Sequence, residues 1–551
     1  MRILLVNWAP IAKGAAVGGG VNGYAQSLAL ELVRLGHDVV SLCGGTKYEP
    51  GEGGKGLSRE PGPPRIVRHE DWRGIRLHEV LNSPVLAPSI NQFNGPAGEV
   101  AHAELERLVA EFVAHLQPDA VHLHNIEGFT AGCIGAIREG CPGVRIIFSL
   151  HNYHTVCPQV YLLRGGRFPC HDFDSGHACA ACVPAPDPAV ARRRIMGGKG
   201  PYAPVFRFIP DPVRRMLWRV PLAHLAARAI KSRLRRRPPP PQPLARDPGA
   251  LHPTWVPLTN SISPPPASVR PPNAYAHRRD AMIAMLNSCD EVLAVSEFVR
   301  AKFVSMGVEA PRIRTQHIGT RLAELAAHHP RVQPRPLVGP DGRPRPIRLV
   351  FLGFNNYAKG LPMLADALGL LVPEVLRRFH LTIHAQGGET IRHRFRRLHP
   401  RLAGMGFHGG YAFEDIPRLL AGADLGVVPS VWWDNAPQTV FEFLACGVPV
   451  LGADLGGIPD FIRDGDNGIL FRGNDRYDLA RRLTEIARAP EVLGSLRANV
   501  RPPRTIAAHA AEVVGVYEGS RAARAGPEVA VTVRTRAPDP RMPLAGRGVT
   551  P

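Results

Sequence analysis

Long apolar runs are scarce in this sequence. No stretch approaches the roughly 18 consecutive apolar residues that a membrane span requires, and the apolar run at 3–6 ends at Asn7 without a small-residue cleavage site. Neither a membrane span nor a secretory leader is therefore expected, and the first apolar run is predicted to be a buried strand of a cytoplasmic protein. Because thiols stay reduced there, the nine cysteines are expected to be core residues or metal ligands before disulfides.

Acidic residues are outnumbered: the chain has 47 Asp and Glu against 67 Lys and Arg, a net charge of +20. Much of the excess lies at 192–246, in runs such as Arg192-Arg193-Arg194 and Arg235-Arg236-Arg237. No zinc-finger, RRM or basic-zipper pattern accompanies them, so they favour an anionic membrane surface over nucleic acid as the partner. That prediction places the protein peripherally on the inner face of the cell membrane. The alternative is a solvated, arginine-rich linker.

The organisation of the chain follows from its length and periodicity. Its 551 residues exceed what one hydrophobic core supports, so two core-bearing domains are expected. In both halves, candidate buried strands alternate with helical patterns, which is typical of parallel sheets covered on both faces. The fold class is therefore predicted to be α/β with two Rossmann-like domains. The expected strands are 3–6, 39–42, 120–123, 144–150 and 291–295, then 347–351, 381–385, 425–428, 448–451 and 468–471.

Proline runs interrupt this alternation after Cys182. Because proline cannot donate to a sheet interior, a basic, Pro-rich insertion in the N-terminal half is predicted. The expected boundaries are a first domain at 1–189, the insertion at 190–279, the rest of the first domain and a linker at 280–335, a second domain at 336–504, a last helix at 505–525 and a disordered tail at 526–551.

A glycine-rich segment follows the first strand. Gly18, Gly20 and Gly23 formally satisfy G-x-G-x-x-G, but the loop is long and no acidic residue ends the second strand to bind a ribose. A dinucleotide site is therefore not expected. Glycines at a helix N-terminus do let N–H groups approach a phosphate or sugar, which predicts Gly19 and Gly20 as binding residues. The alternative is a flexible loop without function.

The strongest signal spans residues 427–450. It reads as a strand, a loop that contains Asp434 and Asn435, a helix that opens at Pro437 and ends at Gly447, and another strand. Asp434 lies at the carboxyl end of a strand, where open α/β sheets bind ligands. Glu442 lies among apolar helix residues, and a buried carboxylate needs a partner. Sugar hydroxyls suit it, because a carboxylate accepts two hydrogen bonds from a vicinal diol.

This stretch resembles the donor site of retaining GT-B glycosyltransferases of the large family four type, which includes bacterial polysaccharide and lipid-sugar transferases. The resemblance implies that two carboxylates eight positions apart flank a donor. Glu442 would bind the ribose, and Asp434, where most members carry Glu, would lie beside the transferred sugar, next to Asn435.

Further segments extend the resemblance. Gly456 and Gly457 look like the family's glycine loop, whose N–H groups would face the diphosphate. Gly353 and Lys359 look like its phosphate-contacting turn, in which Phe354 replaces the usual arginine. Lys359 would then carry more of the charge of the leaving group.

The resemblance also implies an arrangement and an activity. His151, in an H-x-Y segment, would approach the donor sugar, with the acceptor on the N-terminal domain and the donor across a cleft on the C-terminal one. The last helix would return to the first domain. The implied reaction is retaining transfer from a nucleotide-diphosphate sugar to a saccharide or lipid-linked acceptor in cell-surface polysaccharide synthesis. The resemblance implies no catalytic metal. The alternative is an inactive GT-B scaffold that binds a partner or a membrane.

Four cysteines form the pattern C-x12-C-x8-C-x2-C just after the H-x-Y segment. Thiolates with a C-x2-C end are suitable for structural zinc. The prediction is a zinc site at Cys157, Cys170, Cys179 and Cys182. The alternative is a set of unlinked thiols in a loop beside the acceptor cleft.

Overall fold

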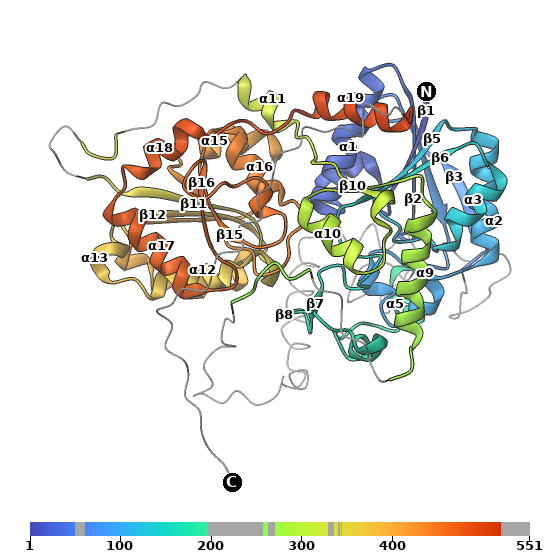
Figure 1. Cartoon of the computed structure of the whole chain (residues 1–551), viewed down its shortest axis with the longest axis horizontal. Helices are drawn as coiled ribbons and strands as arrows, with labels where there is room; N and C mark the ends of the chain where they lie inside the picture. Colours follow the sequence, from blue (N-terminus) through green and yellow to red (C-terminus); the bar gives the residue numbers. More distant parts are fainter. Residues whose placement is uncertain are drawn as a thin grey trace, which may run out of the picture.

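The computed structural model describes residues 1–49, 61–196, 257–262, 270–328, 336–339, 342 and 344–519. Within these residues the expected α/β fold is confirmed: each half of the chain builds its own twisted sheet with helices packed around it (Figure 1). Most of the predicted insertion, much of the predicted linker and the predicted tail at 526–551 lie outside the described residues. Among the helices described, none is long and apolar enough to cross a membrane.

The N-terminal sheet has eight strands in the order β10-β9-β6-β5-β1-β2-β4-β3. All neighbours are parallel except the edge pair β3 and β4. The strands are β1 (Arg2–Val6), β2 (Asp38–Gly44), β3 (Arg65–Arg68), β4 (Ile75–Leu81), β5 (Ala120–Leu123), β6 (Arg145–Leu150), β9 (Glu291–Ala294) and β10 (Ile313–Thr315). The central strand β1 is buried from Ile3 to Val6, as its apolar sequence requires.

The helices of this half are α1 (Gly19–Arg34), α2 (Ala103–Leu116), α3 (Gly132–Gly140), α4 (His177–Ala180), α5 (Pro188–Met196), α9 (Ala274–Ser288), α10 (Glu297–Ser305) and α11 (Leu322–Ala327). A short hairpin pairs β7 (Leu163–Arg164) with β8 (Phe168–Pro169). Helix α9 begins inside the range predicted for the insertion. It starts there because the Asn273 side chain accepts hydrogen bonds from the first free N–H groups of the helix.

The C-terminal sheet has six strands, all parallel, in the order β13-β12-β11-β14-β15-β16. They are β11 (Ile347–Phe354), β12 (Phe379–Gln386), β13 (Gly404–His408), β14 (Leu425–Val428), β15 (Val450–Asp454) and β16 (Gly468–Arg472). Around them lie α12 (Leu361–Gly369), α13 (Pro373–Leu376), α14 (Arg392–Arg396), α15 (Ile416–Leu420), α16 (Gln438–Ala445), α17 (Arg476–Arg488) and α18 (Val492–Asn499).

The last described helix, α19 (Ile506–Tyr517), crosses from the second half to the first and packs against α1 (Figure 1). Two hydrogen bonds of 2.7 Å hold it there: Tyr24 Oη pairs with His509 Nε2, and Tyr517 Oη pairs with His122 Nδ1. Both halves are therefore connected by the end of the chain as well as by the segment that precedes β11.

Candidate functional site

Lys359 and Asp434 form an ion pair at the carboxyl edge of the C-terminal sheet. Lys359 ends the short helix η6 (Tyr357–Lys359) after β11, and Asp434 lies in the loop after β14, the neighbouring strand. The Lys359 Nζ lies 2.7 Å from the Asp434 Oδ2, which also accepts from the Ser430 hydroxyl at 3.2 Å. Asp434 is almost fully buried. The structure thus brings together two residues that lie 75 positions apart in the sequence.

Gly360 explains how these two loops meet. Its φ of +71° is left-handed, and a Cβ there would lie 1.6 Å from the Pro429 carbonyl oxygen. No residue with a side chain fits that approach. The turn that presents Lys359 therefore depends on a glycine that lets the backbone after β11 touch the backbone after β14.

The glycine loop after β15 packs against the backbone of Asp434. Gly456 has a φ of +59°, and a Cβ there would lie 2.2 Å from the Asp434 carbonyl oxygen. Gly457 N–H donates to that oxygen at 2.7 Å, and Gly456 N–H donates to Asn260 Oδ1 at 2.7 Å. Both N–H groups are paired within the protein in this structure, and both glycines hold the Asp434 loop in position. That Gly456 and Gly457 also face a diphosphate stays a prediction.

Glu442 lies on α16, with buried apolar neighbours on the same helix, and remains partly exposed itself. The Tyr411 hydroxyl donates to its Oε2 at 3.0 Å. Burial raises the pKa of Glu442 to about 7, against the opposing effects of the Tyr411 hydrogen bond and the charge of Lys359. The pKa of Tyr411 is itself raised well above its usual value, chiefly by burial, so the phenol stays a donor. A carboxyl group whose ionisation is unfavourable in the absence of a ligand is a candidate binding group.

Tyr411 was missed by sequence reasoning. It follows β13, a half-exposed edge strand whose sequence Gly404-Met405-Gly406-Phe407-His408 lacks an apolar run. The signal that could have found it is the requirement that Glu442 have a polar partner.

Asn435 follows Asp434 and is 2% exposed. Neither its side-chain oxygen nor its side-chain nitrogen has a hydrogen-bond partner among the described residues. Leaving an amide buried and unpaired costs about 1–3 kcal/mol per group. Because this orphaned amide lies next to the Lys359–Asp434 pair, it fits a group that a ligand would satisfy.

The other predicted glycines lie around this centre. Gly353, with a φ of +146°, is the next-to-last residue of β11. Gly19 and Gly20 lie in the first turn of α1 rather than in a loop, because Gly18 caps the helix. A Cβ on Gly20 would lie 3.0 Å from the Gln438 Cγ, at the start of α16. The N-terminal turns of α1 and α16 therefore face each other across the two halves.

His151 directly follows β6, is half-buried, and forms a cluster with the buried His122 and His124. Its Nε2 lies 3.3 Å from the His124 Nδ1, and its ring centroid lies 4.8 Å from that of Tyr24. Burial lowers the pKa of His151 to about 3, so it is a neutral imidazole at physiological pH. Sequence reasoning missed His124 and the rest of the cluster, because its members come from separate elements.

The segment of His151 touches the Asp434 loop through Tyr153. The Tyr153 hydroxyl donates to the Trp433 carbonyl oxygen at 2.9 Å, and both side chains are buried. The structure therefore places His151 and Asp434 on segments that meet across the two halves, although no hydrogen bond or ion pair joins the two side chains.

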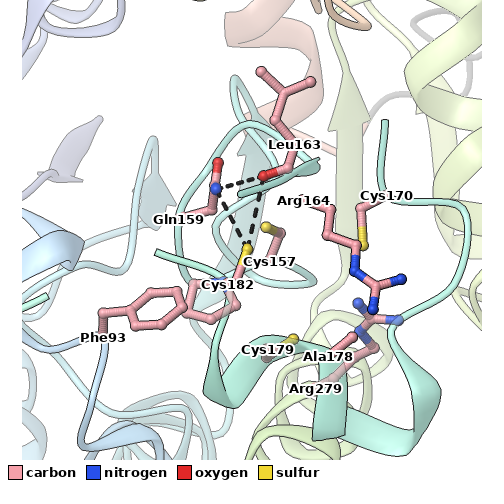
Figure 2. A pocket seen from close by; sticks show the side chains of 11 residues that line it. Phe93, Cys157, Gln159, Leu163, Arg164, Cys170, Ala178, Cys179, Cys182 and Arg279 are labelled. Atoms are coloured by element: carbon pink, nitrogen blue, oxygen red, sulfur yellow. Dashed lines mark hydrogen bonds between the residues drawn. The ribbon is translucent and has the colours of Figure 1, made fainter. Parts of the chain in front are cut away.

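The four predicted zinc ligands line one cavity of about 10 Å³ together with Gln159 and Arg279 (Figure 2). All nine cysteines are free thiols. Gly165 N–H lies 3.3 Å from the Cys182 Sγ, and Gln159 Nε2 lies 3.6 Å from it. Within the described residues, no group of three or more His, Cys, Asp or Glu side chains is arranged to hold a metal ion. The sequence pattern thus predicts which thiols gather, and the zinc itself stays a prediction.

Two Rossmann-like domains, with the candidate site at the strand ends where they meet, define the GT-B class of glycosyltransferases. Comparisons with known proteins agree. A family model described as "Glycosyl transferase 4-like domain" matches residues 19–246, and one described as "Glycosyl transferases group 1" matches residues 346–489. The chain belongs to the GT-B glycosyltransferases of the family four type.

Relatives with curated descriptions match parts of the chain. A putative glycosyltransferase EpsD of Bacillus subtilis is 27% identical over 218 residues, which is 39% of this chain and 55% of that protein. A D-inositol 3-phosphate glycosyltransferase of Thermomonospora curvata is 33% identical over 185 residues, which is 31% of this chain and 43% of that protein. The chain spans about half the length of the curated relatives it matches.

Solved structures share the fold over nearly the whole chain. Sucrose-phosphate synthase from Thermosynechococcus elongatus has a TM-score of 0.54 and 14% identity, covering 95% of this chain and 100% of that one. Anabaena Alr3699/HepE, solved in complex with UDP, has a TM-score of 0.52 and 12% identity, covering 94% of this chain and 100% of that one. At such identities the likeness establishes the fold alone.

Proposed function

We propose that this protein transfers a sugar, with retention, from a nucleotide-diphosphate sugar to a saccharide or lipid-linked acceptor in cell-surface polysaccharide synthesis. The observation that carries the proposal is the Lys359–Asp434 pair, 2.7 Å apart, at the same sheet edge as Glu442. Charged groups at that edge lie where open α/β sheets take their ligands. The UDP complex of Anabaena HepE, which shares the fold, supports a nucleotide in this class.

The roles follow from charge and position. Lys359 would stabilise the departing diphosphate, Asp434 and neutral His151 would orient the sugar, and ionised Glu442 would accept hydrogen bonds from the ribose. The orphaned amide of Asn435 would complete the contacts to the donor. The acceptor would attack on the face from which the diphosphate leaves, so the protein acts through positioning and electrostatics.

A donor screen tests the proposal. UDP-, GDP- and ADP-sugars are offered to the wild type and to Asp434→Ala and Glu442→Ala, with thermal shift and sugar release as readouts. Glu485→Ala, which removes an exposed helix carboxylate paired with Arg481, is the matched control. One nucleotide series is expected to raise the Tm and to be turned over. If no nucleotide shifts the Tm, the donor site fails; a shift without turnover of any donor favours the inactive scaffold.

The cellular setting is a second part of the proposal: a cytoplasmic protein held peripherally on the inner face of the membrane by the basic insertion. Its support is the arginine-rich composition of 192–246. Deleting residues 190–275 should release the protein from anionic vesicles. Unchanged binding after the deletion overturns the anchoring role.

A structural zinc at Cys157, Cys170, Cys179 and Cys182 is a separate proposal. Its support is that four thiols line one cavity and that an N–H group approaches the Cys182 sulfur, as groups around bound thiolates do. Elemental analysis should find one zinc per chain that is lost in Cys182→Ser and kept in the control Cys141→Ser. Wild-type protein that is folded and free of metal overturns it and leaves unlinked thiols.

A further inference from the structure

Residues 257–262 form a short segment without regular secondary structure that contacts both halves. They belong to the range predicted for the insertion and are described in the structure, whereas the residues directly before and after them are not. Leu258 is buried, and its N–H donates to the Gly473 carbonyl oxygen at 2.8 Å. We call residues 257–262 the tie segment. Leu258 anchors it to the C-terminal half.

The next two residues of the tie segment hold both flanks of Asp434. The Trp433 indole Nε1 donates to the Thr259 carbonyl oxygen at 3.0 Å. Asn260 binds Gly456 twice: its Oδ1 accepts from the Gly456 N–H at 2.7 Å, and its Nδ2 donates to the Gly456 carbonyl oxygen at 3.3 Å. Trp433 precedes Asp434 in the chain, and Gly456 lies against its backbone. Both Trp433 and Gly456, on either side of Asp434, are therefore held by the tie segment.

The side-chain amide of Asn260 pairs with the N–H and the carbonyl of Gly456, as the backbone of a neighbouring strand would. Gly456 is held at a positive φ, and glycine loses more conformational freedom on ordering than any other residue. One side-chain amide satisfies both of its backbone groups, which would otherwise have no hydrogen-bond partner among the described residues. Shortening Asn260 would free Gly456 and, through it, the backbone that carries Asp434.

The N-terminal half holds the other side of the tie segment. Lys302 lies on α10 and is 2% exposed; its Nζ donates to the Ser261 carbonyl oxygen at 3.1 Å. The same Nζ lies 4.6 Å from the centroid of the Trp433 ring, a cation–π contact across the two halves. The tie segment is thus bound to both halves at the loop that carries Asp434.

We propose that Asn260 is a positioning residue for sugar transfer, and that the tie segment couples the contact between the two halves to the placement of Asp434. This inference rests on the proposed function. It predicts an effect on the step that uses Asp434, and none on the nucleotide contacts of Glu442 and Tyr411, which the tie segment does not touch in the described structure.

The test compares Asn260→Ala and Asn260→Asp with the control Asn287→Ala. Asn287 also bridges a backbone N–H and a carbonyl, those of Glu309 and Gly307, at the amino-terminal edge of the N-terminal sheet. With the donor found by the screen, Asn260→Ala should lower kcat about 10- to 100-fold, as misplacement of a reacting group does. The Tm shift caused by the nucleoside diphosphate alone should stay as in the wild type.

Asn260→Asp keeps the acceptor for Gly456 N–H and loses the donor, so its kcat should lie between those of the wild type and Asn260→Ala. Should Asn260→Ala prove too unstable to assay, Asn260→Asp and Lys302→Met carry the test, each with a lowered kcat and an unchanged nucleotide shift. Wild-type kcat in these variants overturns the positioning role while leaving the proposed function intact. Wild-type protein that turns over no donor overturns the proposed function itself.

Discussion

The two carboxylates of the candidate site lie eight residues apart and have opposite surroundings. Asp434 lies in a loop and is already paired, with Lys359 at 2.7 Å and Ser430 at 3.2 Å. Glu442 lies on a helix, and its pKa is raised to about 7, chiefly by burial. One carboxylate is thus fixed in place by its partners, whereas the other is held near its titration point. A carboxylate that is fixed in place can orient a sugar. A carboxyl group near its titration point can bind a ligand that donates hydrogen bonds to it.

Breaking the ion pair from the lysine side should have the largest effect. Lys359→Ala removes the cation expected to meet the diphosphate and leaves Asp434 buried without its partner. Loss of one such electrostatic group costs about 10²- to 10³-fold in kcat, measured as sugar release from the donor.

The matched control for that variant is Arg345→Ala. Arg345 pairs at 2.6 Å with Asp424, a buried aspartate just before β14, at the opposite edge of the same sheet. The control should lower the Tm and keep kcat. Equal kcat losses in both variants would mean that the Lys359 pair only stabilises the fold.

Removing the charge of Asp434 should disturb the orientation of the sugar without weakening the binding of the nucleotide. Asp434→Asn keeps the shape and removes the charge, so kcat should fall about 10- to 100-fold. Because Lys359 is then free to meet a phosphate, the Kd of the nucleoside diphosphate should be no weaker than in the wild type. Calorimetric titration checks this, and a clearly weaker Kd would contradict the assignment of Asp434 to the sugar.

Glu442 should make nucleotide binding depend on pH. A carboxyl with a raised pKa is protonated below about pH 7 and must ionise to accept both ribose hydroxyls, so affinity should rise between about pH 6 and pH 8, by at most tenfold per pH unit. Glu442→Gln should flatten this dependence and weaken binding at the upper end. An identical pH profile in the wild type and Glu442→Gln would remove Glu442 from the ribose site.

Titration of Glu442 has the opposite effect on the stability of the ligand-free protein: its free energy of unfolding should fall as the pH rises. The folded carboxyl binds its proton up to about pH 7, whereas an unfolded glutamate loses it near pH 4.3. The contribution of Glu442 to the free energy of unfolding is therefore lost as the pH rises through this window. Nucleotide should protect most at the top of the window, where the ligand-free carboxylate is ionised.

The smallest effect is expected for Tyr411→Phe. The Tyr411 hydroxyl lowers the pKa of Glu442 by donating to it, so its removal should move the midpoint of nucleotide binding to higher pH. The midpoint is read from Kd against pH, with kcat at high pH close to the wild type. A midpoint that moves down would show that Tyr411 does not support the ionised carboxylate.

Sequence reasoning reached much of the fold, because the decisive signals were local. The strand predicted at 120–123 coincides with β5 at both ends, and the predicted strands of the C-terminal sheet overlap five of its six members. The sixth, β13, is an edge strand with two glycines and no apolar run. Such a strand draws its stability from pairing with β12 rather than from its own composition, so its sequence carries little signal.

The candidate site likewise contains residues that could be named from the sequence and residues that could not. Asp434, Glu442 and Lys359 could be named because each follows or joins a recognisable strand or helix. Asn260 and Tyr411 could not, because neither belongs to a recognised motif and their partners lie 196 and 31 residues away. The glycine loop could be predicted from its resemblance to a known motif, but its close approach to the Asp434 carbonyl oxygen could not, and its contact with a diphosphate stays a prediction.

The sequence by itself determined two α/β domains and the residues that carry charge at their strand ends, because hydrophobic periodicity and strand–helix alternation are local properties of the chain. Only the tertiary structure decided how those charges are used. The 2.7 Å pairing of Lys359 with Asp434, the raised pKa of Glu442 and the hold of Asn260 on Gly456 depend on burial and on contacts between distant segments. Those quantities arise when the two sheets fold and the halves meet.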